Sequence, residues 1–224
     1  MRSRAKFALN ILGCLIFFVL VNVMSTCFAE ESFCSLTSPS KCSGTQLTIY
    51  EYSDFQCGYC AKVQPTVNKI LSEYGDRIKF VYKQFPLPVF VHKDAMNASK
   101  ASVAALKQGK FWEMHDLLFK DQRKLKMEDL LAYAGELNLD MEQFKKDMNS
   151  KEVLDMINAE IEEGKKLGVL ATPNFIIGET SILGAKPYEV FKAAIDEALA
   201  KANKVENKIE TKAEQSVQKL DVAK

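Results

Sequence analysis

The pattern of hydrophobic and polar residues predicts two β-strands in the first half of the chain. Residues 46–55 read QLTIYEYSDF and are rich in β-branched and aromatic side chains. Residues 77–85 read RIKFVYKQF, in which Ile78, Phe80 and Tyr82 recur at every second position. Stretches of this composition and period are typical of strands.

Between these two stretches the hydrophobic residues take the period of a helix. After Gly58, large side chains recur at intervals of three and four residues until Gly75, where the pattern stops. They are Val63, Val67, Ile70, Leu71 and Tyr74. Such intervals place side chains on one face of an α-helix. A strand, a helix and a strand within about forty residues form a βαβ unit, so we expect the two strands to be parallel.

The next stretch, residues 94–168, has helical patterns throughout. Short amphipathic segments in this range predict several helices. Glycine is a frequent helix breaker, so we expect Gly109, Gly135 and Gly168 to separate or end them. The range therefore predicts an all-helical block.

Two short strands and a helix complete the predicted fold. Residues 174–178 (NFIIG) and 181–184 (SILG) predict a hairpin with a tight turn. Pro187 suits the first turn of a last helix, which we expect to reach about Ala200. Residues 202–224 alternate Lys and Glu without a dense apolar face, which predicts a flexible charged tail.

The first 29 residues have the layout of a secretory signal. Three basic side chains and no acidic one precede an apolar run at residues 7–24. The small residue Ala29 ends the stretch CFA, so cleavage there would leave Glu30 as the mature N-terminus. An uncleaved membrane anchor is the alternative, because about 18 residues is near the lower limit for a span. Either reading predicts a periplasmic or otherwise exported protein.

Charge and cysteine content refine this picture. The chain has 30 basic and 29 acidic residues, a balance that gives no indication of a nucleic-acid partner. Two of the six cysteines lie in the predicted signal. The other four are Cys34, Cys42, Cys57 and Cys60. An even number of cysteines in an exported chain is typical of disulfide chemistry.

Cys57 and Cys60 form a Cys-x-x-Cys motif at the predicted start of the first helix. Free backbone N–H groups and the positive end of the helix dipole favour a thiolate on Cys57, with a pKa commonly between about 3.5 and 7.5. Three residues on, Cys60 is expected on the same helix face, deeper and within disulfide reach. We therefore expect Cys57 to react with other proteins and Cys60 to resolve the product. A stabilised thiolate is also a good leaving group, which makes the disulfide form oxidising.

A permanent disulfide and a zinc site are the alternative roles of this cysteine pair. A permanent bridge would close a very small loop and gain little entropy. A zinc site would need Cys34 and Cys42, or His92 and His115, to converge on the pair. Their spacings of eight and 23 residues do not resemble those of zinc ribbons or fingers. We therefore expect redox chemistry with no metal or organic cofactor.

The element order βαβ, helical block, ββα is that of an α/β thioredoxin fold interrupted by an all-helical insertion. Five stretches, in order and spacing, resemble the DsbA family of exported thiol-disulfide oxidoreductases. They are EYSDFQCGYC, FPLP with the following His92, KFWEMHDLLF, GVLATPNFIIG and GAKPYEVF. The match covers about residues 46–200. It implies a thioredoxin-like domain of residues 46–93 and 169–201, with 94–168 as the insertion.

The resemblance also implies roles for residues near the cysteine pair. Glu51 stands where this superfamily often carries a buried acid, which would move protons to or from Cys60; the alternative is a side chain that reaches solvent. Pro173 is expected in cis beside the Cys57 sulfur, against the alternative of an ordinary trans turn. The backbone of Thr172 would then pair with an extended client segment.

The N-terminal arm, residues 30–45, lies outside the part of the chain that the family shares. A structural disulfide between Cys34 and Cys42 is the first interpretation, and a shuttle pair that exchanges with Cys57 is the alternative. His115, within an apolar helical segment, is expected to be a core histidine.

These observations predict a monomeric enzyme that introduces disulfides into reduced or misfolded exported proteins. The resemblance implies reoxidation by a DsbB-type or similar membrane partner. Gly58 and Tyr59, expected to contact clients, and Thr172 are also similar to the residues of DsbC isomerases, so isomerase or reductase is the alternative direction. Only about 16 residues separate Glu30 from the first strand, too few for the dimerisation domain of those isomerases. A chaperone-like peptide-binding module is a further alternative.

Overall fold

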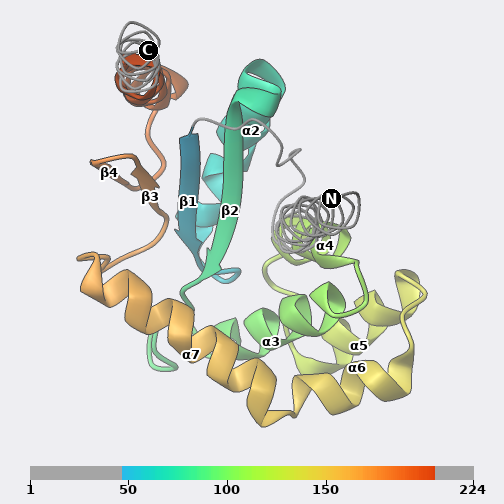
Figure 1. The fold of residues 1–224 in the computed structure, drawn as a ribbon. Coiled ribbons are helices and arrows are strands. Elements are labelled where there is room, and N and C mark those ends of the chain that lie inside the picture. Colours follow the sequence, from blue (N-terminus) through green and yellow to red (C-terminus); the bar gives the residue numbers. More distant parts are fainter. Residues whose placement is uncertain (1–46, 205–224) are drawn as a thin grey trace, which may run out of the picture.

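The computed structural model describes residues 47–204, which begin with the predicted βαβ unit (Figure 1). Its elements are β1 (Leu47–Ser53), α2 (Gly58–Tyr74), the short 3-10 helix η1 (Gly75–Arg77) and β2 (Ile78–Gln84). The strands β1 and β2 are parallel, with Leu47 opposite Ile78 and Ser53 opposite Gln84. The predicted parallel pairing is confirmed.

A block of five helices separates β2 from β3, as the sequence predicts. These are α3 (Ala95–Leu106), α4 (Phe111–Lys120), α5 (Met127–Glu136), α6 (Met141–Met148) and α7 (Lys151–Lys166). Gly109 and Gly168 follow the ends of helices and have positive φ angles of 73° and 79°. The prediction for Gly135 is wrong, because this residue lies inside α5. An exposed helical glycine costs only about 1 kcal/mol relative to alanine, which the helix tolerates.

The chain then forms the predicted hairpin of β3 (Asn174–Ile177) and β4 (Thr180–Leu183). Strand β3 pairs antiparallel with β1, so the sheet order is β2-β1-β3-β4. A last helix occupies 188–204 and begins just after Pro187, whose carbonyl accepts a hydrogen bond from Val190 N at 3.1 Å. It continues past Ala200, so the predicted end was too early.

Several predictions fall outside the described residues. They concern the signal and its apolar run at residues 7–24, the arm with Cys34 and Cys42, and the tail from residue 205 onward. Within residues 47–204, no helix has both the length and the apolar character needed to cross a bilayer.

The two faces of the sheet are covered by different helices. On one face, Ile49, Phe80 and Phe175 pack with the apolar sides of α2 and the last helix. On the other face, Tyr52 and Phe85 pack near α7. Figure 1 shows α7 crossing below the C-terminal ends of β1 and β2, with the rest of the insertion beside it. The insertion thus lies at the end of the sheet where β1 leads into α2.

The close approach of α7 to the sheet depends on Gly164. A methyl group there would lie 2.8 Å from Cε2 of Phe85 and 2.9 Å from Cδ1 of Tyr52. We predict that Gly164→Ala lowers the free energy of unfolding by about 1 to 3 kcal/mol, because overpacking outweighs the gain in helix propensity. Gly135→Ala is the matched control, since a methyl group there meets no atom within 4 Å. Urea unfolding should show a small stabilisation of this control, and equal effects of the two changes would contradict the prediction.

Candidate functional site

The site begins at the turn that joins β1 to α2. Cys57 is the residue before the first helical residue and has an extended backbone, with φ −78° and ψ 119°. Its N–H donates to Asp54 O at 3.1 Å, which closes the turn. The N–H groups at the start of α2 therefore face the Cys57 sulfur, as the sequence predicts.

Several donors lower the pKa of Cys57 to about 5. The largest effect is a hydrogen bond from the Cys60 thiol, followed by one from the Thr172 hydroxyl and by the backbone N–H groups of Cys60 and Tyr59. Burial acts in the opposite direction but is outweighed. Cys57 is therefore a thiolate at neutral pH when the pair is reduced.

Cys60 has the opposite character. Its side chain is fully buried, and burial raises its pKa well above the usual range, with further contributions from Cys57 and from the negative charge of Glu51. The backbone N–H of Asp54 approaches its sulfur at 3.5 Å. The two sulfurs thus differ strongly, with one prepared as a thiolate and the other kept protonated.

The loop before β3 lies against Cys57. The Thr172–Pro173 bond is cis, as expected, and the Cys57 thiol lies 3.4 Å from the carbonyl oxygen of Thr172. The Thr172 hydroxyl is buried and bonds no other described residue in the present geometry. Gly58 and Tyr59 are exposed beside the sulfur, Tyr59 with 63% of its surface accessible. Whether these residues bind clients stays a prediction.

Glu51 is buried beneath the cysteine pair. It has no exposed surface, which rules out the alternative that its side chain reaches solvent. One oxygen accepts a hydrogen bond from Gln64 Nε2 at 3.4 Å, and the other has no partner among the described residues. Burial raises the pKa of Glu51 to about 8, so it is mostly protonated at neutral pH.

Sequence reasoning gave no role to Asp54, although it belongs to the motif. Its carboxylate is buried and accepts hydrogen bonds from Gln56 N at 2.7 Å and Leu87 N at 2.8 Å. Nδ1 of His92 lies 2.7 Å from the same carboxylate. Asp54 therefore ties the cysteine turn to the loop that follows β2. The pairing of Asp54 with His92 depends on residues 38 positions apart, so no local pattern could reveal it.

The helical insertion also contacts the turn. Gln122, which follows α4, donates through Nε2 to the carbonyl oxygens of Phe55 at 2.7 Å and Cys57 at 2.9 Å. Gln56 and Asp94 exchange two hydrogen bonds at the start of α3. No local pattern indicates a role for Gln122. The insertion is thus part of the support of the site.

The histidines do not form a metal site with the pair. His115 is buried among aromatic rings, among them those of Phe55 and Phe119, and burial lowers its pKa, which fits the expected core histidine. Within residues 47–204, no group of three or more His, Cys, Asp or Glu side chains is placed to hold a metal ion.

We predict that Cys57 is the reactive thiol. After reduction, the rate of alkylation by iodoacetamide at Cys57 should rise through pH 5 and level off near neutrality, because its pKa is about 5. Cys60 should stay unmodified over this range. Peptide mass spectrometry distinguishes the two sites, and earlier labelling of Cys60 would reverse the assignment.

Glu51 should make folding stability depend on pH. Its folded-state pKa is raised, so the stability that it contributes is complete below its ordinary value of 4.5 and is lost as pH rises through about 8. Glu51→Gln should therefore stabilise the protein at high pH much more than at low pH, by up to several kcal/mol at about 1.4 kcal/mol per pKa unit. Guanidinium unfolding of wild type and variant, at a pH below 4.5 and at a pH above about 8, measures this difference in the free energy of unfolding. A difference that does not vary with pH would refute it.

The chain is similar to a protein family and to several solved structures. The family model Thioredoxin_4, described as thioredoxin, matches residues 43–197. A thioredoxin-like oxidoreductase from Silicibacter pomeroyi is 27% identical with a TM-score of 0.63, covering 69% of this chain and 87% of that chain. The thiol-disulfide exchange protein alpha-DsbA2 from Wolbachia pipientis is 20% identical with a TM-score of 0.63, over 79% and 96%. A periplasmic thioredoxin-like protein from Salmonella enterica is 21% identical with a TM-score of 0.58, over 74% and 91%.

Curated relatives of higher identity are longer proteins. The Na⁺/H⁺ antiporter NhaA 3 of Salinispora tropica is 35% identical over 156 residues, which are 70% of this chain and 24% of that protein. The antiporter NhaA of Herminiimonas arsenicoxydans is 32% identical over 151 residues, which are 67% of this chain and 24% of that protein. The chain thus spans about a quarter of the length of these relatives. The family match over most of the chain, joined to the thioredoxin-like fold and the Cys57–Cys60 pair, shows that the chain belongs to the Thioredoxin_4 family and is a thioredoxin-like oxidoreductase.

Proposed function

We propose that this protein is an oxidase that introduces disulfides into exported proteins through the Cys57–Cys60 pair. The observation that carries the proposal is the contrast between the two sulfurs: the pKa of Cys57 is lowered to about 5, whereas that of Cys60 is raised. A thiolate stabilised in the reduced protein makes the disulfide form easy to reduce, and therefore oxidising toward clients.

The reaction proceeds by two exchanges. A client thiolate attacks Cys57 Sγ of the enzyme disulfide, so a client–Cys57 bond forms, the Cys57–Cys60 bond breaks and Cys60 leaves with the electron pair. A second client thiolate then attacks the client sulfur, which completes the client disulfide and releases Cys57 as a thiolate. The client has lost two electrons and the cysteine pair has gained them.

Glu51 supplies the proton that this reaction requires. Cys60 leaves as a thiolate in a buried place where its neutral form is strongly favoured. Glu51 is buried nearby and mostly protonated at neutral pH, so it can donate to Cys60 in this direction and accept from Cys60 during reoxidation. Glu51 thereby takes over the negative charge that Cys60 would otherwise carry, until it is protonated again.

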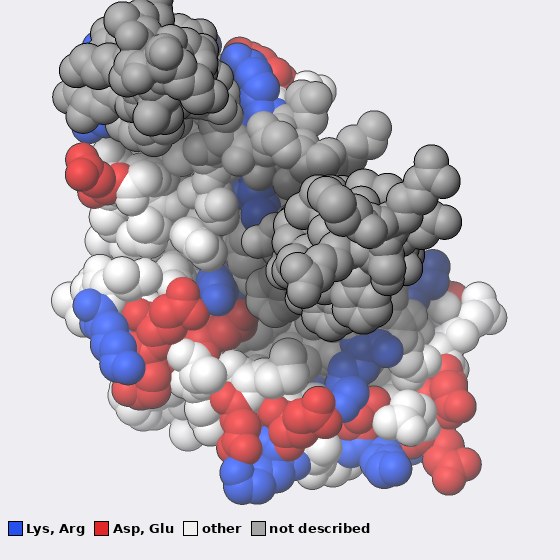
Figure 2. Space-filling model, in the orientation of Figure 1, with Lys and Arg blue, Asp and Glu red and all other residues white. Residues whose placement is uncertain are grey.

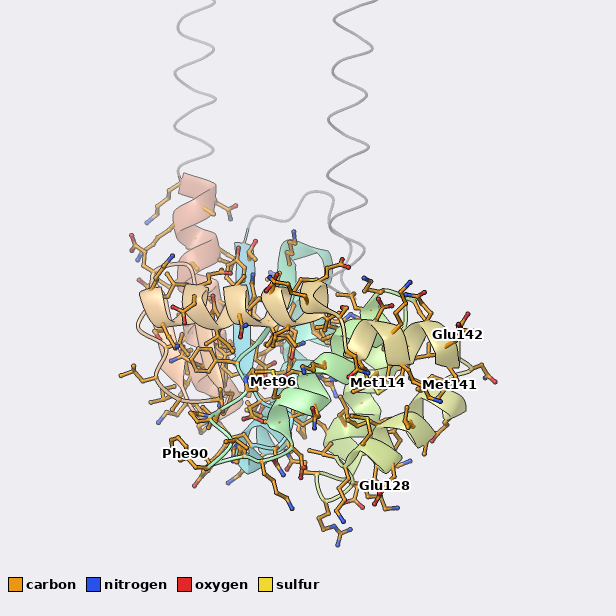
Figure 3. The ribbon with its side chains drawn as sticks, turned by 90° about the horizontal axis from the view of Figure 1, so that it is seen from below. Phe90, Met96, Met114, Glu128, Met141 and Glu142 are labelled. Carbon is orange, nitrogen blue, oxygen red and sulfur yellow. The ribbon has the colours of Figure 1, made fainter. Side chains whose placement is uncertain are left out.

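Client segments bind across the exposed face of the turn. The backbone of Thr172 pairs with an extended client, in the manner of strand addition. Exposed apolar side chains lie on the segments that border Cys57, with accessible fractions of 63% for Tyr59, 86% for Phe90 and 87% for Leu170. Figure 3 shows Phe90 at the margin of the molecule, whereas Met114 is enclosed by the helices of the insertion. An apolar surface of this kind suits unfolded or reduced proteins.

We place the enzyme in the periplasm or an equivalent exported compartment, as a monomer that a DsbB-type or similar membrane partner reoxidises. The layout of the first 29 residues and the resemblance to the DsbA family support this placement. The fold is also that of the periplasmic protein from Salmonella enterica. The Cys34–Cys42 pair is proposed as a structural disulfide of the arm.

Isomerase or reductase action is the second candidate, favoured by the Gly58-Tyr59 dipeptide and by Thr172. Equilibration of the Cys57–Cys60 pair with glutathione separates the directions. We predict a reduction potential of about −120 mV, as in DsbA, and not about −270 mV, as in thioredoxin. The reduced form should also melt at a higher temperature than the oxidised form. A potential near that of thioredoxin would assign the protein to the reductases.

Cys57→Ser provides the control against a pure peptide-binding role. This variant should lose all client oxidation, because the attacked sulfur is gone. Full biological activity of Cys57→Ser would instead show that peptide binding is the function.

A further inference from the structure

A row of polar side chains continues from Glu51 across one face of the sheet. Glu51 lies opposite Tyr82 and Ser53 lies opposite Gln84 in the parallel register. Paired residues project to the same side of a sheet, so these four side chains share a face. All four are buried, with at most 4% of their surface exposed. The apolar side of the sheet is thus interrupted directly beneath the cysteine pair.

Each of these four side chains has a polar atom without a partner among the described residues. The atoms are Oε2 of Glu51, Oγ of Ser53, the hydroxyl of Tyr82 and Oε1 of Gln84. Leaving a buried polar atom unpaired costs about 1 to 3 kcal/mol, so this concentration at one place demands an explanation. Gln84 cannot resolve it by turning over, because its Nε2 already donates to Ser102 Oγ at 2.9 Å.

A cavity adjoins the outer end of the row. It has a volume of about 60 Å³ and is lined by Tyr82, Gln84 and Glu160, with apolar side chains of α3, α4 and α7 completing its wall. A water molecule requires roughly 10 to 15 Å³ and two to four polar partners. Tyr82, Gln84 and Glu160 are the polar residues of the wall, and Tyr82 and Gln84 each have a polar atom without a partner among the described residues.

Glu160 connects the cavity to the surface. Its Oε2 accepts a hydrogen bond from Gln84 N at 2.7 Å, and 27% of its side chain is exposed. The charged groups that face it are Lys83 of β2, at 3.7 Å, and Glu163 of α7. Acidic side chains gather over this part of the surface, along α7 (Figure 2). Burial raises the pKa of Glu160 to about 7, so both its protonated and its charged forms are populated near neutrality.

We propose that the cavity holds ordered water bonded to Tyr82, Gln84 and Glu160, and that this hydrated site is the route by which Glu51 exchanges its proton with solvent. The inference rests on the proposed function of Glu51 as proton donor and acceptor for Cys60. When Cys60 leaves as a thiolate, it takes the proton of the protonated Glu51. The Tyr82 hydroxyl then donates its proton to the Glu51 carboxylate and receives one from cavity water, which Glu160 replaces from solvent. During reoxidation the same groups carry the proton outward, so that Glu51 can accept the one that Cys60 loses. No electrons move in these steps, and Tyr82, the water and Glu160 end with the protons that they had at the start.

Electrostatics also place the inner groups close to one another. The negative charges of Glu51, Cys60 and Asp54 all raise the pKa of Tyr82, after burial, whereas the Ser53 hydroxyl lowers it. The same Ser53 hydroxyl lowers the pKa of Glu51 and that of Cys60.

Exchange of the Cys60 thiol proton for deuterium tests the route directly. In the reduced protein at neutral pH, Cys57 is a thiolate, so the S–H infrared band that Cys60→Ser removes belongs to Cys60. After rapid dilution into D₂O, this band should disappear at least about tenfold more slowly in Tyr82→Phe and in Glu160→Gln than in wild type. In these variants exchange must wait for local unfolding of the protein around Cys60. Tyr82→Phe keeps the ring that stacks on Phe55 at 5.2 Å.

Glu163→Gln is the matched control. Glu163 lies on the same helix and also bonds Lys83, at 2.9 Å, but it does not line the cavity. In this variant the Cys60 thiol proton should exchange at the wild-type rate. Wild-type exchange in Tyr82→Phe or in Glu160→Gln would overturn the route, as would a high-resolution crystal structure with an empty cavity.

Failure of the route and failure of the proposed function give different results. Reaction of Cys57 with a small aromatic disulfide requires no proton from Cys60, so its rate should be the same in wild type, Tyr82→Phe and Glu160→Gln. Slow exchange in the variants of a protein that does not oxidise clients would uphold the route and reject the oxidase. Client oxidation with unchanged exchange in both variants would uphold the oxidase and reject the route.

Discussion

The site depends on one buried carboxylate. Asp54 accepts hydrogen bonds from the cysteine turn and from the loop after β2, and it has no exposed surface. A buried carboxyl group is costly unless hydrogen-bond partners surround it, so these segments must stay together to keep those hydrogen bonds. The position of Cys57 at the start of α2, and with it the effect of the free N–H groups on the sulfur, follows from this constraint.

The difference between the two sulfurs comes from three parts of the chain. The βαβ unit places Cys57 at a helix start and Cys60 one turn deeper. The loop with Thr172 adds a hydroxyl that favours the thiolate. The insertion contributes Gln122, which donates to the carbonyl oxygens of Phe55 and Cys57, the second of which also accepts the hydrogen bond from Ala61 N in the first turn of α2. A helical block inserted far along the chain therefore belongs to the redox site.

Sequence patterns predicted what depends on local periodicity. The parallel strands, the hairpin, the helical insertion and the position of Cys57 follow from residues close together in sequence. Gly135 was misassigned because a breaker signal says nothing of how much a helix tolerates at an exposed position. The partners Asp54 with His92, and Glu51 with Tyr82, are set by tertiary register, which single-sequence patterns do not contain. Family resemblance, in contrast, gave the cis bond at Pro173.

The hydrogen bond from Gln84 N to Glu160 also affects how the edge of the sheet can pair with other chains. Among residues 47–204, strand β2 is an edge of the sheet, and a free edge offers its backbone groups to any extended chain. Glu160 occupies the last donor of that edge with a carboxylate oxygen. Another extended chain or a second copy of the protein thus cannot extend the sheet at this end of β2. The side chain of α7 therefore protects the backbone of the edge strand from pairing there.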